Sequence, residues 1–425
     1  MVLLVVSVPV LVLAIVGLPH VFRDPVRLRI AAADPLGGPA ATSPDFSALL
    51  ALVTGAEPLG GHQVEVLLDG DGTFPRLWAD LRAARRSITM QMYYAAPGAV
   101  TDSVVRILAE RARAGVAVLF LYDAFGAQDL TEGDLARLRA AGARTAELRP
   151  LRWYALDRGN HRSHVRGVVI DGGVAYTGGF GFDDKWLGGG RRPREWRETN
   201  VRFTGPAVAR LQESFVAKWA EATGVLLVDE RLLPRSGGPA VPGSTAAVLL
   251  SPPVEGSTAA QRLLVQAIES AGERLYITNA YFVPHGGFVP LLAEAARRGV
   301  DVRILTNGPR SDVRTTWLAG RSHYEPLLEA GVRLYEYRPT TLHAKTFVVD
   351  GFWSAVGTIN FDNRSLAYND EVALLSLDPG LGARMDSVFL ADLGYAEEIR
   401  LEIFRRRPWS QRLLEHGAGL LSRLL

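Results

Sequence analysis

The amino-acid sequence predicts an α/β protein made of two tandem α/β/α units that form a pseudo-two-fold pair, preceded by an apolar N-terminal helix. Four pairs of segments recur in the same order, strand and helix patterns alternate within each copy, and the last pair is a histidine strand. The chain has 425 residues, of which 48% are hydrophobic and 22% are charged. This length and composition are typical of a globular protein with two or three domains.

The repeat keeps its order along the chain. Residues 86–97 match 274–284, 112–122 match 296–306, 141–150 match 330–339, and 164–172 match 343–351. Because the spacing between the copies is nearly constant, only the loops differ in length. Duplication of one unit explains this pattern better than two unrelated domains that share signals by chance.

Each copy reads as strand, helix, strand, helix, strand and then the histidine strand. The helical spacing of apolar residues over 101–114 and 288–298 stops at a glycine in both copies, which suits the left-handed position after a helix. The runs 116–122 and 300–306 are continuously apolar or alternating, as is typical of buried strands in an α/β layer. The sequence therefore predicts one α/β topology twice.

The predicted domain organisation has six segments. They are a membrane anchor (1–20), a linker (21–60), the first unit (61–228), a second linker (229–244), the second unit (245–410) and a C-terminal amphipathic helix (411–425). The linkers are predicted from their Pro, Gly, Ala and Ser content. The C-terminal helix lies either in a membrane interface or docked on its own core, and its sequence fits both.

The N-terminal segment is apolar from Val2 to Leu18 apart from Ser7, and arginines follow it from Arg23 onward. This length is at the short end for a membrane span, and the arginines that follow place the rest of the chain in the cytoplasm. A cleaved signal peptide and an apolar helix packed on the protein are the alternatives. We expect a membrane anchor with a cytoplasmic catalytic part.

Composition excludes some kinds of chemistry. The chain has no cysteine, which excludes thiol catalysis, disulfides and cysteine-based zinc sites. The formal net charge is only +2, so nothing global predicts a nucleic-acid partner. Among the 47 basic residues only Lys185, Lys218 and Lys345 are lysines.

The second histidine strand places a base and a cation together. His343 and Lys345 stand at positions i and i+2, so a strand directs both side chains to the same face. Asp350 has the opposite parity and is followed by Gly351, which predicts a turn. We expect Asp350 to be a structural anchor, and Asp171 to be its equivalent in the first copy.

The first histidine strand carries His164 and Arg166 at the equivalent positions. A pseudo-two-fold association of the copies would bring two imidazoles and two cations together. Two imidazoles facing across an anionic group suit covalent displacement, because one attacks and the other protonates the leaving group. The cations would neutralise the non-bridging oxygens as phosphorus becomes five-coordinate.

The paired His-x-Lys-x4-Asp pattern resembles the phospholipase D superfamily, and the surrounding sequence resembles its bacterial cardiolipin synthase branch. The resemblance covers most of residues 62–410 and includes the motifs Asn160 to His164, Val283-Pro284, Ser311-Asp312 and Gly357 to Ser365. It implies two phospholipase D-like units packed as a pseudo-dimer with one shared site. It also implies a phosphohistidine intermediate and phosphatidyl transfer without a metal or other cofactor.

The resemblance implies a role for each motif residue. His164, in the N-terminal motif, is expected to be the nucleophile, and His343 the general acid and then the general base. Lys345 and Arg166 are expected to bind the phosphate oxygens. The first motif departs from the family pattern because it carries arginine instead of lysine, although a guanidinium also binds phosphate.

Further donors are expected after each motif. Thr358 and Asn360 stand at i and i+2 and can add donors from one face. The equivalent positions in the first copy are Gly179 and Gly181, so the backbone N–H groups of Gly178 and Gly179 are expected to substitute in part.

Each imidazole also needs a carboxylate to fix its tautomer. Glu198 follows His164, and Glu371 follows His343, at similar intervals. Asp370 is the alternative to Glu371, and a solvated acidic side chain is the alternative interpretation for both glutamates.

The expected function is that of a cardiolipin synthase-type phosphatidyltransferase at the bacterial inner membrane. Its expected partners are phospholipids, with phosphatidylglycerol as the donor, and the membrane, and nucleic acid is not expected. Phospholipase D hydrolysis and a phospholipase D-like nuclease are alternatives, because the same site chemistry serves all three. A catalytically weakened membrane-associated binding protein is a further alternative, because Arg166 replaces the lysine of the first motif.

Overall fold

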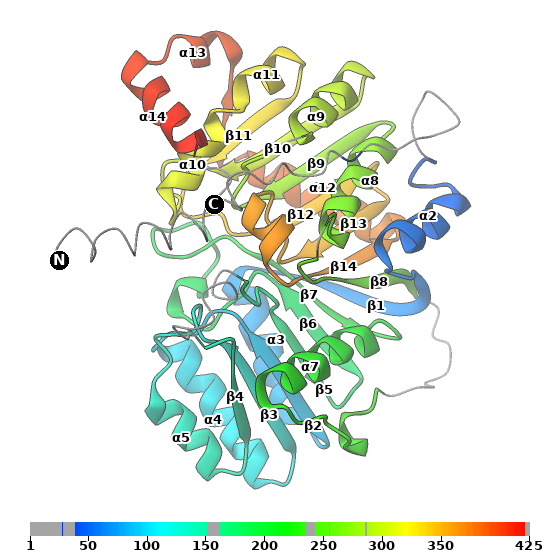
Figure 1. Cartoon of the computed structure of the whole chain (residues 1–425), viewed down its shortest axis with the longest axis vertical. Coiled ribbons are helices and arrows are strands. Elements are labelled where there is room, and N and C mark those ends of the chain that lie inside the picture. Colours follow the sequence, from blue (N-terminus) through cyan, green and yellow to red (C-terminus); the bar gives the residue numbers. More distant parts are fainter. Residues whose placement is uncertain are drawn as a thin grey trace, which may run out of the picture.

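The computed structural model describes residues 28, 39–150, 161–234, 243–254, 256–284 and 287–420, and it shows a mixed α/β protein around one large sheet (Figure 1). The first half contributes β1 (Leu59–Leu68), β2 (Ser87–Met92), β3 (Ala117–Asp123), β4 (Arg144–Leu148), β5 (Gly167–Ile170), β6 (Val174–Gly178) and β7 (Thr199–Thr204). The second half contributes β8 (Ser244–Ser251), β9 (Arg274–Asn279), β10 (Asp301–Asn307), β11 (Arg333–Tyr337), β12 (Lys345–Val349), β13 (Trp353–Gly357), β14 (Glu371–Leu377) and β15 (Ala396–Ile399).

The two halves share one strand order. Outward from the central antiparallel pair of β1 and β8, the first half runs β1-β7-β6-β5-β2-β3-β4. The second half runs β8-β14-β13-β12-β9-β10-β11, with β15 added at its edge. In each half three neighbouring strands are parallel to one another, as expected for strands joined by helices. They are β2-β3-β4 in the first half and β9-β10-β11 in the second half. The repeat in the sequence therefore corresponds to a repeat in topology.

Helices cover both faces of the sheet in each half. In the first half α3 (Asp69–Ala83), α4 (Ala99–Arg113) and α5 (Glu132–Ala140) cover one face, and α7 (Val208–Thr223) covers the other. In the second half α2 (Pro44–Thr54), α8 (Ala259–Ser270), α9 (Phe288–Arg297) and α11 (Tyr324–Glu329) face α12 (Pro379–Leu393) across the sheet. Three further helices, α10 (Arg314–Arg321), α13 (Leu401–Arg405) and α14 (Trp409–Leu420), belong to the second half.

The apolar strand runs are explained by burial on both faces. In β3, Val118 and Phe120 pack in the core under α4, while Leu119 and Leu121 pack in the core under α7 with Trp219. Because side chains alternate along a strand, a strand covered on both faces reads as an uninterrupted apolar run. The glycines predicted to end the two helices, Gly115 and Gly299, both have left-handed φ values, 88° and 96°.

A shared apolar cluster joins the two halves beside the histidine strands. It contains Phe203 of the first half together with Val356 and Val372 of the second half. Val165, next to His164, and Ala344, next to His343, are buried in the same cluster. Apolar packing between the halves therefore fixes the backbone that carries both histidines.

One expected segment lies outside the described residues, and another contains a helix that the sequence did not predict. The anchor expected over 1–20 lies outside the described residues, and none of the helices in the described ranges has the length and apolarity to cross a bilayer. The expected linker 21–60 contains α2, whose Phe46 and Leu50 are fully buried in the core of the second half. This helix is short and rich in small residues, so composition suggested a connection where packing has formed an element.

Asp171 and Asp350 anchor the two histidine strands, as the sequence predicts. Asp350 accepts hydrogen bonds from three backbone N–H groups at the start of β9, those of residues 272–274, at 2.8–3.0 Å. Asp171 binds residues 85–87 at the start of β2 in the same way. Both aspartates are left-handed, with φ values of 54° and 53°, and each is followed by a left-handed glycine.

Replacement of Asp350 by alanine is expected to lower the free energy of unfolding by about 2–4 kcal/mol, because it removes the acceptor of three N–H groups and strains a left-handed residue. Asp350→Asn keeps an acceptor oxygen and tolerates the same backbone, so it should cost less than half as much. Urea denaturation followed by circular dichroism measures both. A loss within about 0.5 kcal/mol for Asp350→Ala would contradict the anchoring role.

Candidate active site

The two histidines lie just before β5 and β12, and each meets the cation two residues further on. The Nζ atom of Lys345 lies 2.9 Å from His343 Nε2. A guanidinium nitrogen of Arg166 lies 3.5 Å from His164 Nε2. All four side chains are buried. The same-face geometry predicted from the i and i+2 spacing is therefore present in both halves.

A backbone clasp holds each histidine against the opposite half. The N–H of His164 donates to the carbonyl of Asp370 at 3.0 Å, and the N–H of His343 donates to the carbonyl of Arg197 at 2.8 Å. The N–H groups of Asp370 and Arg197 return a bond to the carbonyl two residues before each histidine. These pairings form two isolated bridges that cross between the halves. Asp370 directly precedes Glu371, and Arg197 directly precedes Glu198.

The histidine–carboxylate pairs are therefore crossed. His164 Nδ1 lies 2.9 Å from Glu371, and His343 Nδ1 lies 2.6 Å from Glu198. The sequence intervals suggested that each glutamate would serve the histidine of its own copy, and that pairing is wrong. The clasp is the physical reason, because it places the residue before each glutamate beside the histidine of the other half.

The two carboxylates have different surroundings. Glu371 accepts hydrogen bonds from the hydroxyls of Thr358 and Ser365, and from Asn369 Nδ2 at 3.4 Å. Glu198 accepts from the N–H of Thr199 at 3.0 Å and from the indole of Trp186 at 3.4 Å. Both glutamates are buried, so the interpretation of either as a solvated side chain is wrong.

Gly179 of the first copy is explained by the space that Glu198 occupies. A Cβ atom on Gly179 would lie 2.3 Å from a carboxylate oxygen of Glu198, so no larger residue fits. Thr358 stands at the equivalent position of the second copy and donates to Glu371. The carbonyl of Gly179 accepts a hydrogen bond from Arg166, and Gly178 has a φ of 144° that favours glycine.

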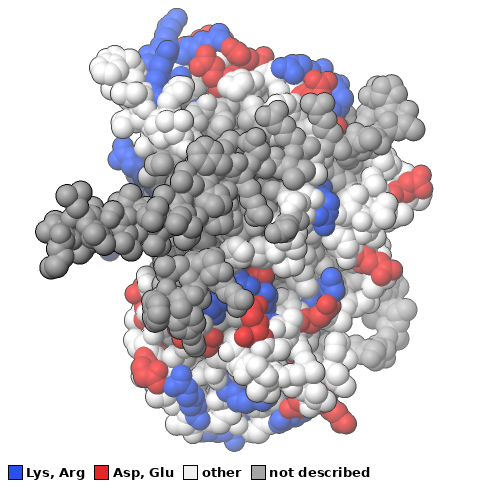
Figure 2. All heavy atoms as spheres, in the orientation of Figure 1, with Lys and Arg blue, Asp and Glu red and all other residues white. Residues whose placement is uncertain are grey.

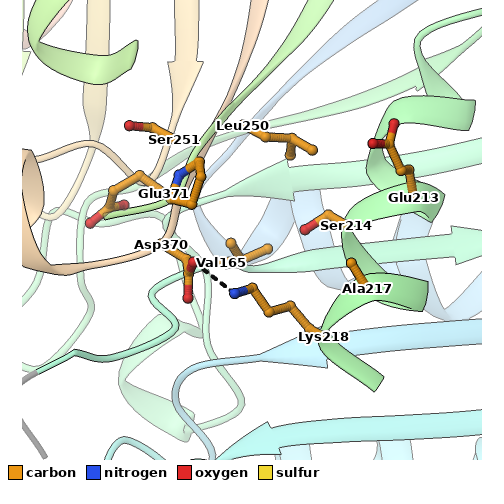
Figure 3. Close-up of a pocket in the computed structure, with 10 residues that line it drawn as sticks. Val165, Glu213, Ser214, Ala217, Lys218, Leu250, Ser251, Asp370 and Glu371 are labelled. Carbon is orange, nitrogen blue, oxygen red and sulfur yellow. Dashed lines mark ion pairs between the residues drawn. The ribbon is translucent and has the colours of Figure 1, made fainter. Parts of the chain in front are cut away.

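Asp370, the alternative to Glu371, forms ion pairs with two cations outside the histidine pair. Its oxygens lie 2.7 Å from Arg149 and 2.9 Å from Lys218. Figure 3 shows Lys218 reaching from α7 toward Asp370 across a cavity of about 190 Å³. This cavity lies between α7, β8 and the start of β14, with Glu371 in its wall. The side chain of Asp370 therefore binds these two cations, and its backbone carbonyl positions His164.

Burial sets the protonation of the site. Loss of water, and then the charges of Arg166 and Lys345, lower the pKa values of both histidines well below 6.5, so both are neutral at pH 7. Burial lowers the pKa of Lys345 to about 7 and raises that of Glu371 to about 8. A carboxylate with a raised pKa is a stronger base toward the Nδ1–H of His164, which makes the opposite nitrogen of that ring more nucleophilic.

Asn360 carries a buried polar atom without a partner among the described residues. Its N–H donates to Ser365 at 2.8 Å, while its side-chain Oδ1 has no hydrogen bond within the described part of the chain. The oxygen and nitrogen of an amide exchange places by a rotation, so this atom can equally be a donor. Asn360 is thus suited to bind a group that enters the site.

Aromatic side chains that the sequence interpretation missed line both histidines. The ring of Tyr93 lies 4.9 Å from that of His164, with Arg166 stacked 5.8 Å above it. The rings of Trp196 and Tyr281 lie 5.1 Å and 6.2 Å from that of His343. A signal was present for Tyr281, because it matches a tyrosine of the first copy in the repeat.

Lys185 fills an aromatic cage next to His343. Its Nζ atom lies 3.6 Å from the ring centre of Tyr94, 4.4 Å from that of Trp196 and 4.8 Å from that of Trp186. The last two rings also contact His343. With Lys218 beside Asp370, all three lysines of the chain lie at or directly beside the site.

Comparison with known proteins agrees with this geometry. The family model described as "Cardiolipin synthase, PLD-like domain" matches residues 77–219 and 264–393. The cardiolipin synthase of Geobacillus kaustophilus is 35% identical over 379 residues, which cover 88% of this chain and 75% of that protein. Cardiolipin synthase A of Pseudomonas entomophila is 33% identical over 378 residues, which cover 86% and 76%.

Solved structures show the same fold at low identity. Phosphatidylserine synthase of Haemophilus influenzae has a TM-score of 0.66 at 14% identity, covering 87% of this chain and 97% of that one. Polyphosphate kinase of Porphyromonas gingivalis has a TM-score of 0.54 at 13% identity, covering 84% and 53%. From the family model and the relatives together, the chain belongs to the cardiolipin synthase branch of the phospholipase D-like family.

Proposed function

We propose that this protein is a phosphatidyltransferase of the cardiolipin synthase type that works through a phosphohistidine intermediate. The observation that carries the proposal is a single buried site with two crossed histidine–carboxylate pairs and two cations. The name of the relatives, cardiolipin synthase, supports phospholipids as the substrate class, and phosphatidylglycerol is the proposed donor. The two halves act as a pseudo-two-fold pair in which neither half completes a histidine–carboxylate pair alone.

His164 attacks the phosphorus of phosphatidylglycerol through Nε2, because Glu371 holds its Nδ1. A bond forms from Nε2 to phosphorus, and the bond from phosphorus to the glycerol oxygen breaks. His343, which takes up a proton when the anionic phosphodiester binds, gives that proton to the glycerol oxygen and becomes neutral again. The neutral His343 then takes the proton from a hydroxyl of a second phosphatidylglycerol. That oxygen attacks phosphorus and releases His164, so the products are glycerol and cardiolipin.

The phosphate oxygens are held by Arg166 and Lys345, with the side-chain amide of Asn360, whose Oδ1 has no partner among the described residues, as a further donor. Thr358 holds Glu371 in place, because its one hydroxyl proton is already donated to that carboxylate. The backbone N–H groups of Gly178 and Gly179 remain proposed donors on the side of the first half. No metal or organic cofactor is required by this sequence of steps.

The proposed location is the bacterial inner membrane, with residues 1–20 as the anchor and the catalytic part in the cytoplasm. Lipid is favoured over nucleic acid because the chain has a net charge of +2 and Figure 2 shows acidic and basic side chains interspersed on the visible face.

The intermediate should be trapped on His164. Phosphatidylglycerol radiolabelled in its phosphate is expected to leave an adduct with an acid-labile, base-stable phosphorus–nitrogen bond on the His343→Gln variant and none on His164→Gln, because only the first retains the nucleophile. An adduct on His164→Gln would contradict the assignment of roles.

Wild-type protein with phosphatidylglycerol should release glycerol and cardiolipin in equal amounts, measured by enzymatic glycerol assay and thin-layer chromatography. Phosphatidic acid as the sole lipid product would indicate phospholipase D hydrolysis instead. Nicking of DNA with intact lipid would indicate a nuclease.

The value of kcat/KM for phosphatidylglycerol should fall above about pH 8 and approach a tenfold loss per pH unit there, because the ammonium of Lys345 in the free enzyme, with a pKa lowered to about 7, has lost its proton, while Glu371, with a pKa raised to about 8, has completed its ionisation. Lys345→Arg retains its charge at high pH, so its profile should rise with the ionisation of Glu371 and then stay flat to at least pH 9 even if its maximum is lower. Stopped assays from pH 5 to 9 in constant ionic strength measure both. Identical falling limbs in the two proteins would show that another group titrates.

Arg166→Met is expected to lower kcat about 10²- to 10³-fold, because it removes one charged donor to the phosphate. Arg166→Lys should lose less than about tenfold, because a charge remains near His164. Steady-state turnover of phosphatidylglycerol measures both, with matched melting temperatures as the control for folding. Near-wild-type turnover of Arg166→Met would mean that the first motif contributes little.

A further inference from the structure

The C-terminal helix α14 packs on the protein through its polar side. Glu415 is fully buried, and its carboxylate lies 2.7 Å from both Arg321 of α10 and Arg407. Gln411, one turn earlier, donates to the same carboxylate at 3.1 Å. Glu415 is the only buried residue of this helix. The docking of α14 therefore depends on a buried ion-pair network and not on an apolar stripe.

The apolar side chains of α14 point the other way. Trp409, Leu413 and Leu420 are 77%, 64% and 85% exposed, respectively. Their spacing of four and seven residues places them on one face of the helix, opposite Glu415. Ile403 of α13 is also largely exposed. A surface helix of a soluble protein normally has the reverse arrangement, so this apolar face has a function other than core packing.

Cations border the apolar face. Arg406 and Arg412 are exposed, and neither has an acidic partner among the described residues. Figure 1 places α13 and α14 together at one end of the long axis of the molecule. A helix with Trp and Leu on one side and arginine at its border has the pattern of a segment that lies in the interface of an anionic bilayer.

A short chain of contacts connects α14 to the active site. The helix packs on α10, which begins two residues after Asp312. The carboxylate of Asp312 accepts a hydrogen bond from the hydroxyl of Tyr281 at 2.7 Å, and the ring of Tyr281 faces His343. A surface that binds α14 would therefore lie near the side of the site that contains Tyr281 and His343.

We propose that α14, with Ile403, Arg406 and Arg412, seats the enzyme on an anionic lipid surface and brings the His343 side of the site to that surface. A second copy of the chain is a poorer occupant, because a symmetric contact through this face would bring the unpaired arginines of two copies together. The role of this contact in turnover rests on the proposed function. The lipid contact of α14 itself does not, because it can be tested without turnover.

The absence of cysteine makes a local test straightforward. An environment-sensitive fluorophore is attached to Leu413→Cys in the full chain, with His164→Gln added so that no turnover occurs. Vesicles containing 40% phosphatidylglycerol should shift its emission to the blue, and pure phosphatidylcholine vesicles should shift it much less. Raising the salt should reduce the shift by screening the arginines. The matched control is a probe at Leu52→Cys, another highly exposed leucine, on α2, which should not shift.

Three results would overturn the proposal. The first is no blue shift at position 413 with anionic vesicles. The second is a shift that grows with protein concentration in the absence of lipid, which would identify a second copy as the occupant. The third is an emission already blue-shifted in dilute protein without vesicles, which would identify another part of this chain as the cover.

Activity provides a second readout. The triple variant Trp409→Ser, Leu413→Ser and Leu420→Ser should lose about tenfold or more in turnover of vesicle phosphatidylglycerol, because it removes the apolar contact with the bilayer. It should keep its rate toward the water-soluble diester bis(p-nitrophenyl) phosphate, as should the control Leu52→Ser. Equal losses on both substrates would contradict a role in seating. If wild-type protein turns over neither substrate, the proposed function fails while the fluorescence result still decides the lipid contact.

Discussion

The hydrogen bond from each histidine Nδ1 to a carboxylate of the opposite half is the interaction on which the rest of the structure depends. It requires the two halves of the sheet to meet in one register, which the central pair of β1 and β8 and the shared apolar cluster provide. The clasp at Asp370 and Arg197 then fixes the backbone on either side. A shift of one half by a single residue would break both pairs together, so the fold and the site are specified by the same contacts.

A bound phosphodiester changes the balance of charge in the site. Arg166 and Lys345 face Glu198 and Glu371 in a buried space, and the ionised forms of these four groups offset one another. A bound phosphodiester adds one negative charge in the same low-dielectric surroundings. This charge favours a proton on one imidazole, which the free site disfavours by burial. The substrate itself thereby helps to create the general acid that its leaving group needs.

The sequence was sufficient for the repeated topology and for the residues that meet at the site, because both depend on local spacing. The i and i+2 pairs, the Asp-Gly anchors and the glycines after α4 and α9 are all set by a few neighbouring residues. The crossed carboxylates could not be predicted, since sequence interval says nothing about which half a side chain faces. Helix α2 and the cage around Lys185 were missed for the same reason, because partners far along the chain define them.

The scarcity of lysine in this chain draws attention to the few positions where lysine is present. Arginine supplies nearly all of the positive charge, and lysine is found only at three positions around the site. Lys345 places a compact ammonium 2.9 Å from His343, Lys185 fits an ammonium among three rings, and Lys218 borders the cavity beside Asp370. Arg166 marks the place where charge alone was enough. Lysine therefore marks the positions where the small amine suits the site, and arginine serves where any cation is sufficient.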